Sequence, residues 1–191
     1  MLVPFALAHL LLRASLPQLD GRVGVKGPGS PIEIERDGLG VPTIQAQSRA
    51  DLAFGTGFVH GQDRFFQMDL ARRLAAGELA ELFGEVALAQ DRKARLFDFR
   101  EVARQVLGQT SPAQRELLEA YARGVNAGLE SLRARPWEYW ILRARPAAWR
   151  AEDSFLVVYA MWWDLQYGDI EGDILRHRLN DKLGGAVCAD G

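Results

Sequence analysis

The sequence has 191 residues, with 23 basic and 25 acidic side chains, a formal net charge of -2 and 48% apolar residues. This composition is typical of a folded globular protein, and the near-neutral charge argues against a nucleic-acid partner, which normally requires a basic surface. The single cysteine, Cys188, excludes an internal disulfide framework and a cysteine-based zinc cluster.

An apolar segment, residues 2–12, opens the sequence and is followed by Arg13. It is too short to span a bilayer, which takes about 20 residues. Its length fits the apolar part of an export signal, although no basic residue precedes it. Two interpretations stay open: residues 1–15 are the remnant of an export signal, or they form an amphipathic segment that docks on the protein body or anchors it to a membrane.

The next pattern predicts a small β-hairpin. Residues 19–31 are rich in glycine and proline and indicate an irregular connection. Residues 32–35 alternate apolar and charged side chains, and residues 41–44 form a second short strand with Pro42 near its edge. The turn between them, residues 37–40, contains two glycines. No other segment gives a convincing β signal.

Capping residues mark two helix starts. Ser48 with Asp51 three residues later predicts a capping box, and the helix that it opens extends toward a stop at Gly84. The glycines at which a neighbouring segment could approach this helix closely are Gly55, Gly57 and Gly61. The capping residues of the second start are Ser111, Pro112 and Gln114.

The last third of the chain predicts a buried helix in need of cover. Residues 137–149 are aromatic and interrupted by proline, which indicates a packed loop. Residues 155–163 are apolar on every side, so we expect a helix buried all round. A separate amphipathic helix should follow and end at residues 184–185. The other helices offer one apolar stripe each, which is too little to cover this helix on all sides, so we expect an obligate partner. The expected fold class is mostly α with a small N-terminal β-hairpin.

Few residues in the sequence suggest catalysis. Cys188 has no histidine near it in the sequence, and we find neither a Gly-x-Ser-x-Gly motif nor a phosphate-binding glycine loop. His60 is either a hydrogen-bonded histidine on a packed helix, the interpretation that we favour, or a general base. The residues expected to form ion pairs along a helix face are Asp63, Arg64, Asp69, Arg72 and Arg73. These motifs predict no self-contained active site.

Four acidic residues fall within ten positions near the start of the last helix. They are Asp164, Asp169, Glu171 and Asp173. Carboxylates near a helix N-terminus ordinarily complement the helix dipole. Several together can also hold a hard cation such as calcium, which takes six to eight oxygen ligands. The spacing is not that of an EF-hand, and taken alone it favours the dipole interpretation.

A long block of the sequence is similar to a known family. Residues 51–69 read DLAFGTGFVHGQDRFFQMD, preceded by GVPTI at 40–44 and followed by GELAELFG at 77–84. With the segment from 136 to 149, these motifs resemble the penicillin acylase family of N-terminal-nucleophile amidohydrolases. The resemblance covers roughly residues 16–185 and concerns only the small α subunit. It implies the α subunit of an αββα heterodimer, whose large β chain comes from the same precursor.

The resemblance implies that no catalytic residue lies in this chain. In the family, a precursor cuts itself before a serine that becomes the first residue of the β chain. The serine Oγ attacks the amide, and its own α-amino group is the base. By the same analogy, residues 16–185 form the helical domain, and residues 186–191 form a tail next to the processing site. We expect a periplasmic or secreted protein, with possible membrane association through residues 1–15.

Four residues carry expected roles by alignment with the family. Met161 and Leu165 match positions that line the acyl pocket, and Asp164 matches a position near the pocket mouth. Glu171 matches the α-chain ligand of a structural calcium ion whose other ligands come from the β chain, which reverses the preference for the dipole interpretation. Members specific for benzylpenicillin have Phe at the position of Leu165 and Arg at that of Asp164. These differences predict a preference for medium or long aliphatic acyl groups.

Several functions fit these expectations. The leading hypothesis is the α subunit of an amidohydrolase that cleaves aliphatic penicillins or related N-acyl amides. An acyl-homoserine-lactone acylase is an alternative within the family. A helical interaction subunit without catalytic activity and a calcium-dependent structural module are alternatives outside it, and the latter would bind the metal without a β chain.

Overall fold

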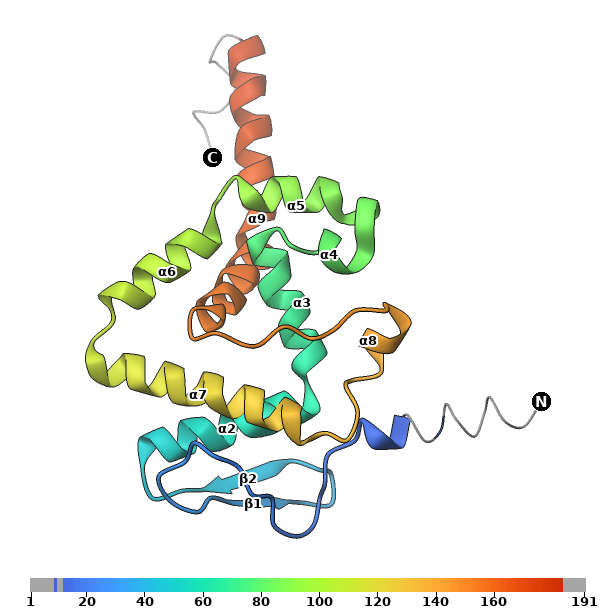
Figure 1. Cartoon of the computed structure of the whole chain (residues 1–191). Helices are drawn as coiled ribbons and strands as arrows, with labels where there is room; N and C mark the ends of the chain where they lie inside the picture. Colours follow the sequence, from blue (N-terminus) through green and yellow to red (C-terminus); the bar gives the residue numbers. More distant parts are fainter. Residues whose placement is uncertain (1–8, 10–11, 184–191) are drawn as a thin grey trace, which may run out of the picture.

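The computed structural model describes residue 9 and residues 12–183, apart from the side chains of residues 167–171 and 183. The predicted tail, residues 186–191, and most of the predicted N-terminal segment, residues 1–15, therefore lie outside the described residues. The described part consists mostly of helices, with one two-stranded sheet at one end of the molecule (Figure 1). The elements are β1 (Glu33–Arg36), β2 (Pro42–Gln45), α2 (Arg49–Asp63), α3 (Phe65–Ala76), α4 (Ala80–Phe83), a 3-10 turn (Gly84–Ala87), α5 (Leu88–Arg95), α6 (Phe99–Gln109), α7 (Pro112–Ser131), α8 (Glu138–Ile141) and α9 (Asp153–Leu183).

The predicted hairpin is confirmed. Strands β1 and β2 pair antiparallel, with Ile34 opposite Ile44 and with Pro42, the first residue of β2, opposite Arg36. The Asp37 carboxylate closes the turn by accepting hydrogen bonds from the backbone amides of Leu39 (2.9 Å) and Val41 (2.8 Å). The hairpin lies beside α2 at the base of the molecule as drawn in Figure 1.

The predicted helix from Ser48 to Gly84 is wrong in its extent, because the chain bends at Arg64. Ser48 caps α2, with its Oγ accepting from the amide of Asp51 at 3.0 Å. Only this half of the predicted capping box forms, because the Asp51 carboxylate accepts from the Ser48 hydroxyl and not from its backbone amide. The Asp51 carboxylate also accepts from the amide of Gly29 at 2.7 Å and ties the preceding loop to the helix. Arg64 is not helical (φ -140°), and α3 ends earlier than expected, at Gly77. The bend lets α2 pack on α7 while α3 packs on α9.

Helices α2 and α7 touch along their backbones, as the glycines of α2 predicted. A Cβ atom at Gly57 or Gly61 would overlap a carbonyl oxygen of α7. The contact is reciprocal, because a Cβ at Gly124 or Gly128 of α7 would overlap a carbonyl oxygen of α2. The capping box that begins α7 at Ser111 is also confirmed.

Helix α9 differs from the expectation in two respects. It is one continuous helix of 31 residues, where we expected two helices. The apolar stretch is also not buried all round within this chain: Leu156 is fully buried, whereas Met161 and Leu165 are 59% and 65% exposed. Helices α3 and α6 cover one side, and the far half of α9 projects beyond the other helices in Figure 1. In the part of the chain that the structure describes, no helix has the length and apolar character needed to cross a membrane.

Candidate functional site

The start of α9 is held by a buried carboxylate. Asp153, the first residue of the helix, is 1% exposed and accepts hydrogen bonds from Arg72 of α3 (2.6 Å) and Arg100 of α6 (3.1 Å). Its Oδ2 atom also accepts from the backbone amide of Arg150 at 2.8 Å. Two helices and the preceding loop therefore fix the position of α9, and the two guanidinium groups offset the cost of burying the charge.

A second buried carboxylate extends this network into the core. Asp69 is completely buried, and its oxygens accept from Arg72 Nε (2.7 Å), Arg73 Nε (3.0 Å) and the Tyr139 hydroxyl (2.6 Å). Burial and the neighbouring Asp69 charge raise the pKa of Tyr139 above its ordinary value, so this phenol donates. The predicted ion pairs between Asp69 and the two arginines exist, but they are buried and continue to Asp153, where the sequence suggested a solvated helix face.

The opposite side of α9 presents an apolar surface. Met161 and Leu165 are one turn apart on the same face, and Val158, which is 52% exposed, lies one turn before Met161. Asp164 is exposed and lies beside Leu165 at the edge of this face. The structure thus brings Met161, Asp164 and Leu165 together on one exposed helical surface. We call Val158, Met161 and Leu165 the open face of α9.

The fourth predicted residue is not tested. Glu171 belongs to α9, but its side chain lies outside the described residues. Among the described residues, no three His, Cys, Asp or Glu side chains gather as a metal site would require. Asp173, the last residue of the predicted acidic cluster, pairs on the helix surface with Arg176 at 2.8 Å.

Five aromatic rings from two parts of the chain meet beside the open face, and sequence reasoning did not bring them together. They are Phe97, Phe99, Tyr159, Trp162 and Trp163. Three of them lie on α9, inside the stretch that the sequence marked as apolar on all sides. Phe97 lies in the turn before α6 and Phe99 is the first residue of α6. Both precede the α9 rings by sixty residues or more, and no local pattern links them to α9.

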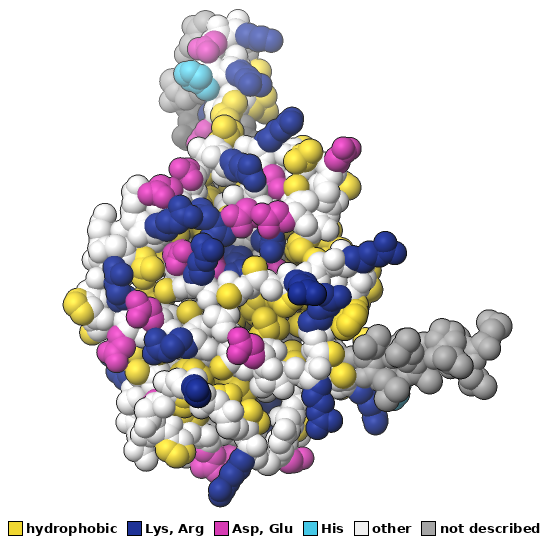
Figure 2. Space-filling view, viewed as in Figure 1, with side chains coloured by type: hydrophobic (Ala, Val, Ile, Leu, Met, Phe, Trp, Pro, Cys, Tyr) yellow, Lys and Arg dark blue, Asp and Glu magenta, His cyan; other side chains and the backbone are white. Residues whose placement is uncertain are grey.

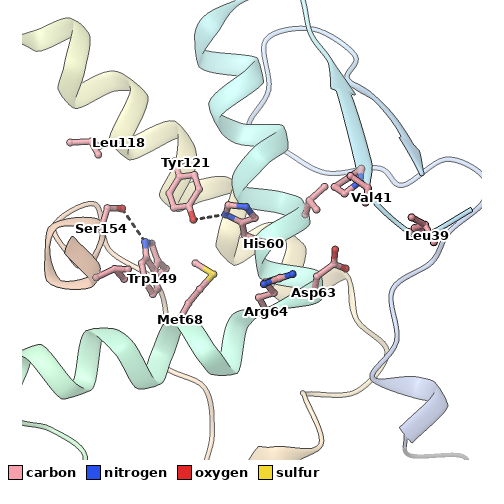
Figure 3. Close-up of a pocket in the computed structure, with 14 residues that line it drawn as sticks. Leu39, Val41, His60, Asp63, Arg64, Met68, Leu118, Tyr121, Trp149 and Ser154 are labelled. Carbon is pink, nitrogen blue, oxygen red and sulfur yellow. Dashed lines mark hydrogen bonds between the residues drawn. The ribbon is translucent and has the colours of Figure 1, made fainter. Parts of the chain in front are cut away.

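A separate open groove of about 830 Å³ lies between the hairpin turn, α2, α7 and the start of α9 (Figure 3). The side chains that line the groove are mainly apolar. Among its polar residues is His60, whose Nδ1 lies 2.9 Å from the Tyr121 hydroxyl. Burial raises the pKa of Tyr121 to about 12. Partial burial of the imidazole and the nearby Arg64 cation lower the pKa of His60. At neutral pH an un-ionised phenol therefore lies against an uncharged imidazole, and the tautomer of His60 decides which of the two donates. A hydrogen-bonded histidine is the interpretation of His60 that we favoured.

The groove residues do not assemble a nucleophile with a base. Ser154 is the one serine among the described residues that line the groove, and it accepts from the Trp149 indole at 3.4 Å instead of contacting His60 (Figure 3). Asp63 is paired with Arg36 of β1 at 2.8 Å. Over the face drawn in Figure 2, basic and acidic side chains intermingle without forming a basic stripe.

Comparisons with known proteins identify the class to which this fold belongs. Residues 31–190 match the family model described as Penicillin amidase. The chain therefore belongs to the penicillin amidase family, and the resemblance inferred from the sequence is confirmed. A solved structure of a thermostable penicillin G acylase from Alcaligenes faecalis is similar with a TM-score of 0.68 and 28% sequence identity, covering 82% of this chain and 85% of that chain. The mostly helical α-subunit fold is thereby confirmed.

Curated relatives come from two kinds of acylase. The chain is 40% identical over 147 residues to the penicillin acylase 2 proenzyme of Pseudomonas sp. strain SE83, covering 77% of this chain and 19% of that protein. It is 36% identical over 171 residues to the acyl-homoserine lactone acylase QuiP of Pseudomonas aeruginosa, covering 89% of this chain and 20% of that protein. The chain thus spans about a fifth of the length of these relatives, as a subunit of a larger processed precursor would.

Proposed function

We propose that this chain is the α subunit of an N-acyl amidohydrolase and that the open face of α9 forms part of its acyl-binding pocket. The observation that carries the proposal is the apolar surface around Met161 and Leu165, which is rigidly held from behind yet uncovered within this chain. Such a surface needs a complement, because large exposed apolar patches mark interaction or ligand sites. Relatives that are about four times as long as this chain provide room for one.

The proposed reaction is hydrolysis of a linear amide by a nucleophile on the partner chain. The N-terminal serine of the β chain attacks the amide carbonyl with its Oγ, while its α-amino group, with a pKa near 8 in a free chain, accepts the proton. The amine leaves, an acyl-serine ester remains, and water releases the acid. Backbone or side-chain donors of the β chain stabilise the oxyanion. The role of the present chain is to bind and orient the acyl group.

The open face favours a flexible aliphatic acyl group. Leu165 stands where benzylpenicillin-specific members have Phe, and Asp164 stands where they have Arg. A branched aliphatic side chain lacks the flat surface on which a phenyl ring stacks. A carboxylate at the pocket edge also repels a substrate carboxylate that an arginine would attract. We therefore assign medium or long aliphatic amides as the acyl substrate class.

A homoserine lactone is the second candidate for the leaving group. The relative with the larger coverage of this chain, QuiP, is named an acyl-homoserine lactone acylase, and its alignment covers 89% of the chain. Homoserine lactone is uncharged, whereas the β-lactam nucleus of penicillins carries a carboxylate. The carboxylate of Asp164 is therefore better suited to the lactone than to the penicillin nucleus.

The proposal includes a calcium ion and a location outside the cytoplasm. Glu171 would supply one carboxylate to the ion, which needs six to eight oxygen ligands, so the β chain would supply the others. A hard cation with carboxylate ligands fits a structural role that joins two chains. We place the protein in the periplasm or among secreted proteins, with residues 1–15 as an export-signal remnant or membrane anchor.

The test is an assay of the complete precursor gene product. We expect a self-processed enzyme whose kcat/KM is higher for octanoyl amides than for phenylacetyl amides of the same amine. A clear preference for phenylacetyl would contradict the aliphatic specificity but not the reaction. Failure to hydrolyse any acyl amide, together with a gene that encodes no serine-initiated second chain, would instead support a helical interaction subunit without catalytic activity.

A further inference from the structure

The aromatic cluster beside the open face places one large ring at its border. Trp162 contacts Phe97 and Phe99 in T-shaped geometry, with ring centroids 6.0 Å and 5.8 Å apart. The two phenylalanines stack on each other at 5.3 Å, and Phe99 stacks on Tyr159 at 5.0 Å. These separations are those of favourable aromatic pairs. The indole of Trp162 is therefore held on one side by rings that are themselves fixed.

The backbone between the two phenylalanines explains why both reach α9. Asp98, which separates them, has a left-handed conformation with φ 46°, a conformation that residues other than glycine adopt rarely. It lies immediately before α6 and turns the chain there. Both neighbouring rings are thereby directed onto the same part of α9, where they contact Trp162 and Trp163.

Trp162 also belongs to the exposed side of the helix. It is 39% exposed, although its neighbour Trp163 is only 8% exposed. It follows Val158 by four residues and precedes Leu165 by three, and residues three and four apart are neighbours on a helix surface. The exposed part of the indole therefore borders the open face on the side nearer the aromatic cluster, while Asp164 lies at the other edge.

We infer that Trp162 is a specificity-determining residue: its fixed indole forms a flat side wall of the acyl-binding surface and limits the width of the acyl group. This inference rests on the proposed function, because it takes the open face to be the acyl-binding surface. A linear alkyl chain lies against an indole at little cost. A phenyl ring is wider, and the rings behind the indole prevent it from moving aside. Trp162 is three residues away from Leu165, so its indole stands beside the acyl group and narrows the space there; it does not replace the flat surface that a phenyl ring would need at the position of Leu165.

The test compares substrates in the processed complex of this chain with its partner. In Trp162→Ala we expect the octanoyl to phenylacetyl ratio of kcat/KM to fall by on the order of tenfold, a change typical of a small alteration in an apolar pocket. Trp162→Phe keeps a ring against Phe97 and Phe99 and should give a smaller fall. Trp137→Ala is the control, because this indole is 47% exposed on the loop before α8, outside the aromatic cluster.

A variant of Phe99 tests whether this ring acts on specificity only by holding the indole of Trp162 in place. Phe99 acts through Trp162 as a positioning residue, so Phe99→Leu alone should lower the same ratio. In a chain that already carries Trp162→Ala, Phe99→Leu should change the ratio no further, a non-additivity that a merely structural role would not produce. Additive effects of the two substitutions would overturn the assignment of Phe99.

The outcomes distinguish this inference from the proposed function. If the unsubstituted complex hydrolyses octanoyl amides but processed Trp162→Ala keeps its ratio within about twofold, the role of Trp162 is wrong and the proposed function stands. If Trp162→Ala does not accumulate in processed form, the ratio of Trp162→Phe decides, and an unchanged value overturns the inference. If the unsubstituted complex hydrolyses neither amide, the proposed function fails and the inference fails with it.

Discussion

At the start of α9, Asp153 accepts from two arginines while only 1% of its surface is exposed. Asp153→Asn keeps the shape but removes the charge and leaves Arg72 and Arg100 incompletely paired. Breaking a buried ion pair in this way costs about 3–5 kcal/mol. We therefore expect a large fall in the free energy of unfolding, measured from the urea unfolding midpoint of the processed complex.

The matched control for this variant is Asp173→Asn, also on α9. Asp173 pairs with Arg176 at 2.8 Å, but both side chains are more than 60% exposed. Surface pairs of this kind contribute at most about 1 kcal/mol. Similar small shifts of the unfolding midpoint in both variants would show that the buried network is not important for stability.

His60 makes the stability of the protein depend on pH in the mildly acidic range. Partial burial and Arg64 lower its pKa below the ordinary 6.5. The unfolded chain therefore takes up this proton at a higher pH than the folded chain does. The contribution of a neutral His60 is complete above pH 6.5 and is lost as the pH falls below that value.

Replacing the imidazole should remove this dependence. In His60→Gln, the thermal midpoint should fall less steeply between pH 6.5 and 5 than in the unsubstituted protein, because glutamine does not titrate and its oxygen can still accept from Tyr121. His177→Gln, on the exposed surface of α9, serves as the control. If the thermal midpoint fell equally steeply with pH in His60→Gln and in the unsubstituted protein, His60 would not be the cause of the pH dependence.

Among the helices, the pair α2 and α7 tolerates the least change. In Gly124→Ala, the added Cβ would overlap the carbonyl oxygen of Phe54, and neither backbone can move without separating the helices. Overpacking typically costs about 1–3 kcal/mol and occasionally more, and an overlap with backbone atoms places this variant at the upper end. We expect a sharp loss of soluble protein and a lower unfolding midpoint in what remains.

Gly108→Ala provides the comparison for that variant. Gly108 lies in α6, and a Cβ there would meet nothing within 4 Å. Alanine is the better helix former by about 1 kcal/mol, so this substitution should stabilise the protein or leave it unchanged. If Gly124→Ala were equally harmless, the close packing of α2 on α7 would be wrong.

The elements that sequence reasoning predicted well have local signals. The cap at Ser111 and the glycine spacing of α2 reside in a few neighbouring residues, and both are confirmed. The bend at Arg64 has no such signal, because neither glycine nor proline marks it. The helix that ends there does so because α2 and α3 pack on different partners, which is a tertiary cause.

The same distinction applies to the candidate site across the whole molecule. The shared surface of Met161 and Leu165 follows from helical spacing and could be predicted. The wall at Trp162 could not, because it depends on Phe97 in the turn before α6 and on Phe99, the first residue of α6. Among the described residues, none covers the outer side of residues 155–163, and under the proposed function the β chain supplies this cover. A pattern of apolar residues predicts that a helix will be buried, but it does not show whether the same chain or a partner chain covers it.

Arg72 imposes an order of events on the synthesis of this protein. Its guanidinium bonds at once to Asp69, to the carbonyls of Ala147 and Ala148, and to Asp153, which lies 81 residues further along the chain. At about 5–20 residues per second, a ribosome needs roughly 4–16 s to make that stretch. During this interval Asp69, three residues earlier, is the one of these partners that the nascent chain already contains. The full set of hydrogen bonds from Arg72 can therefore form only after the ribosome has begun to make α9.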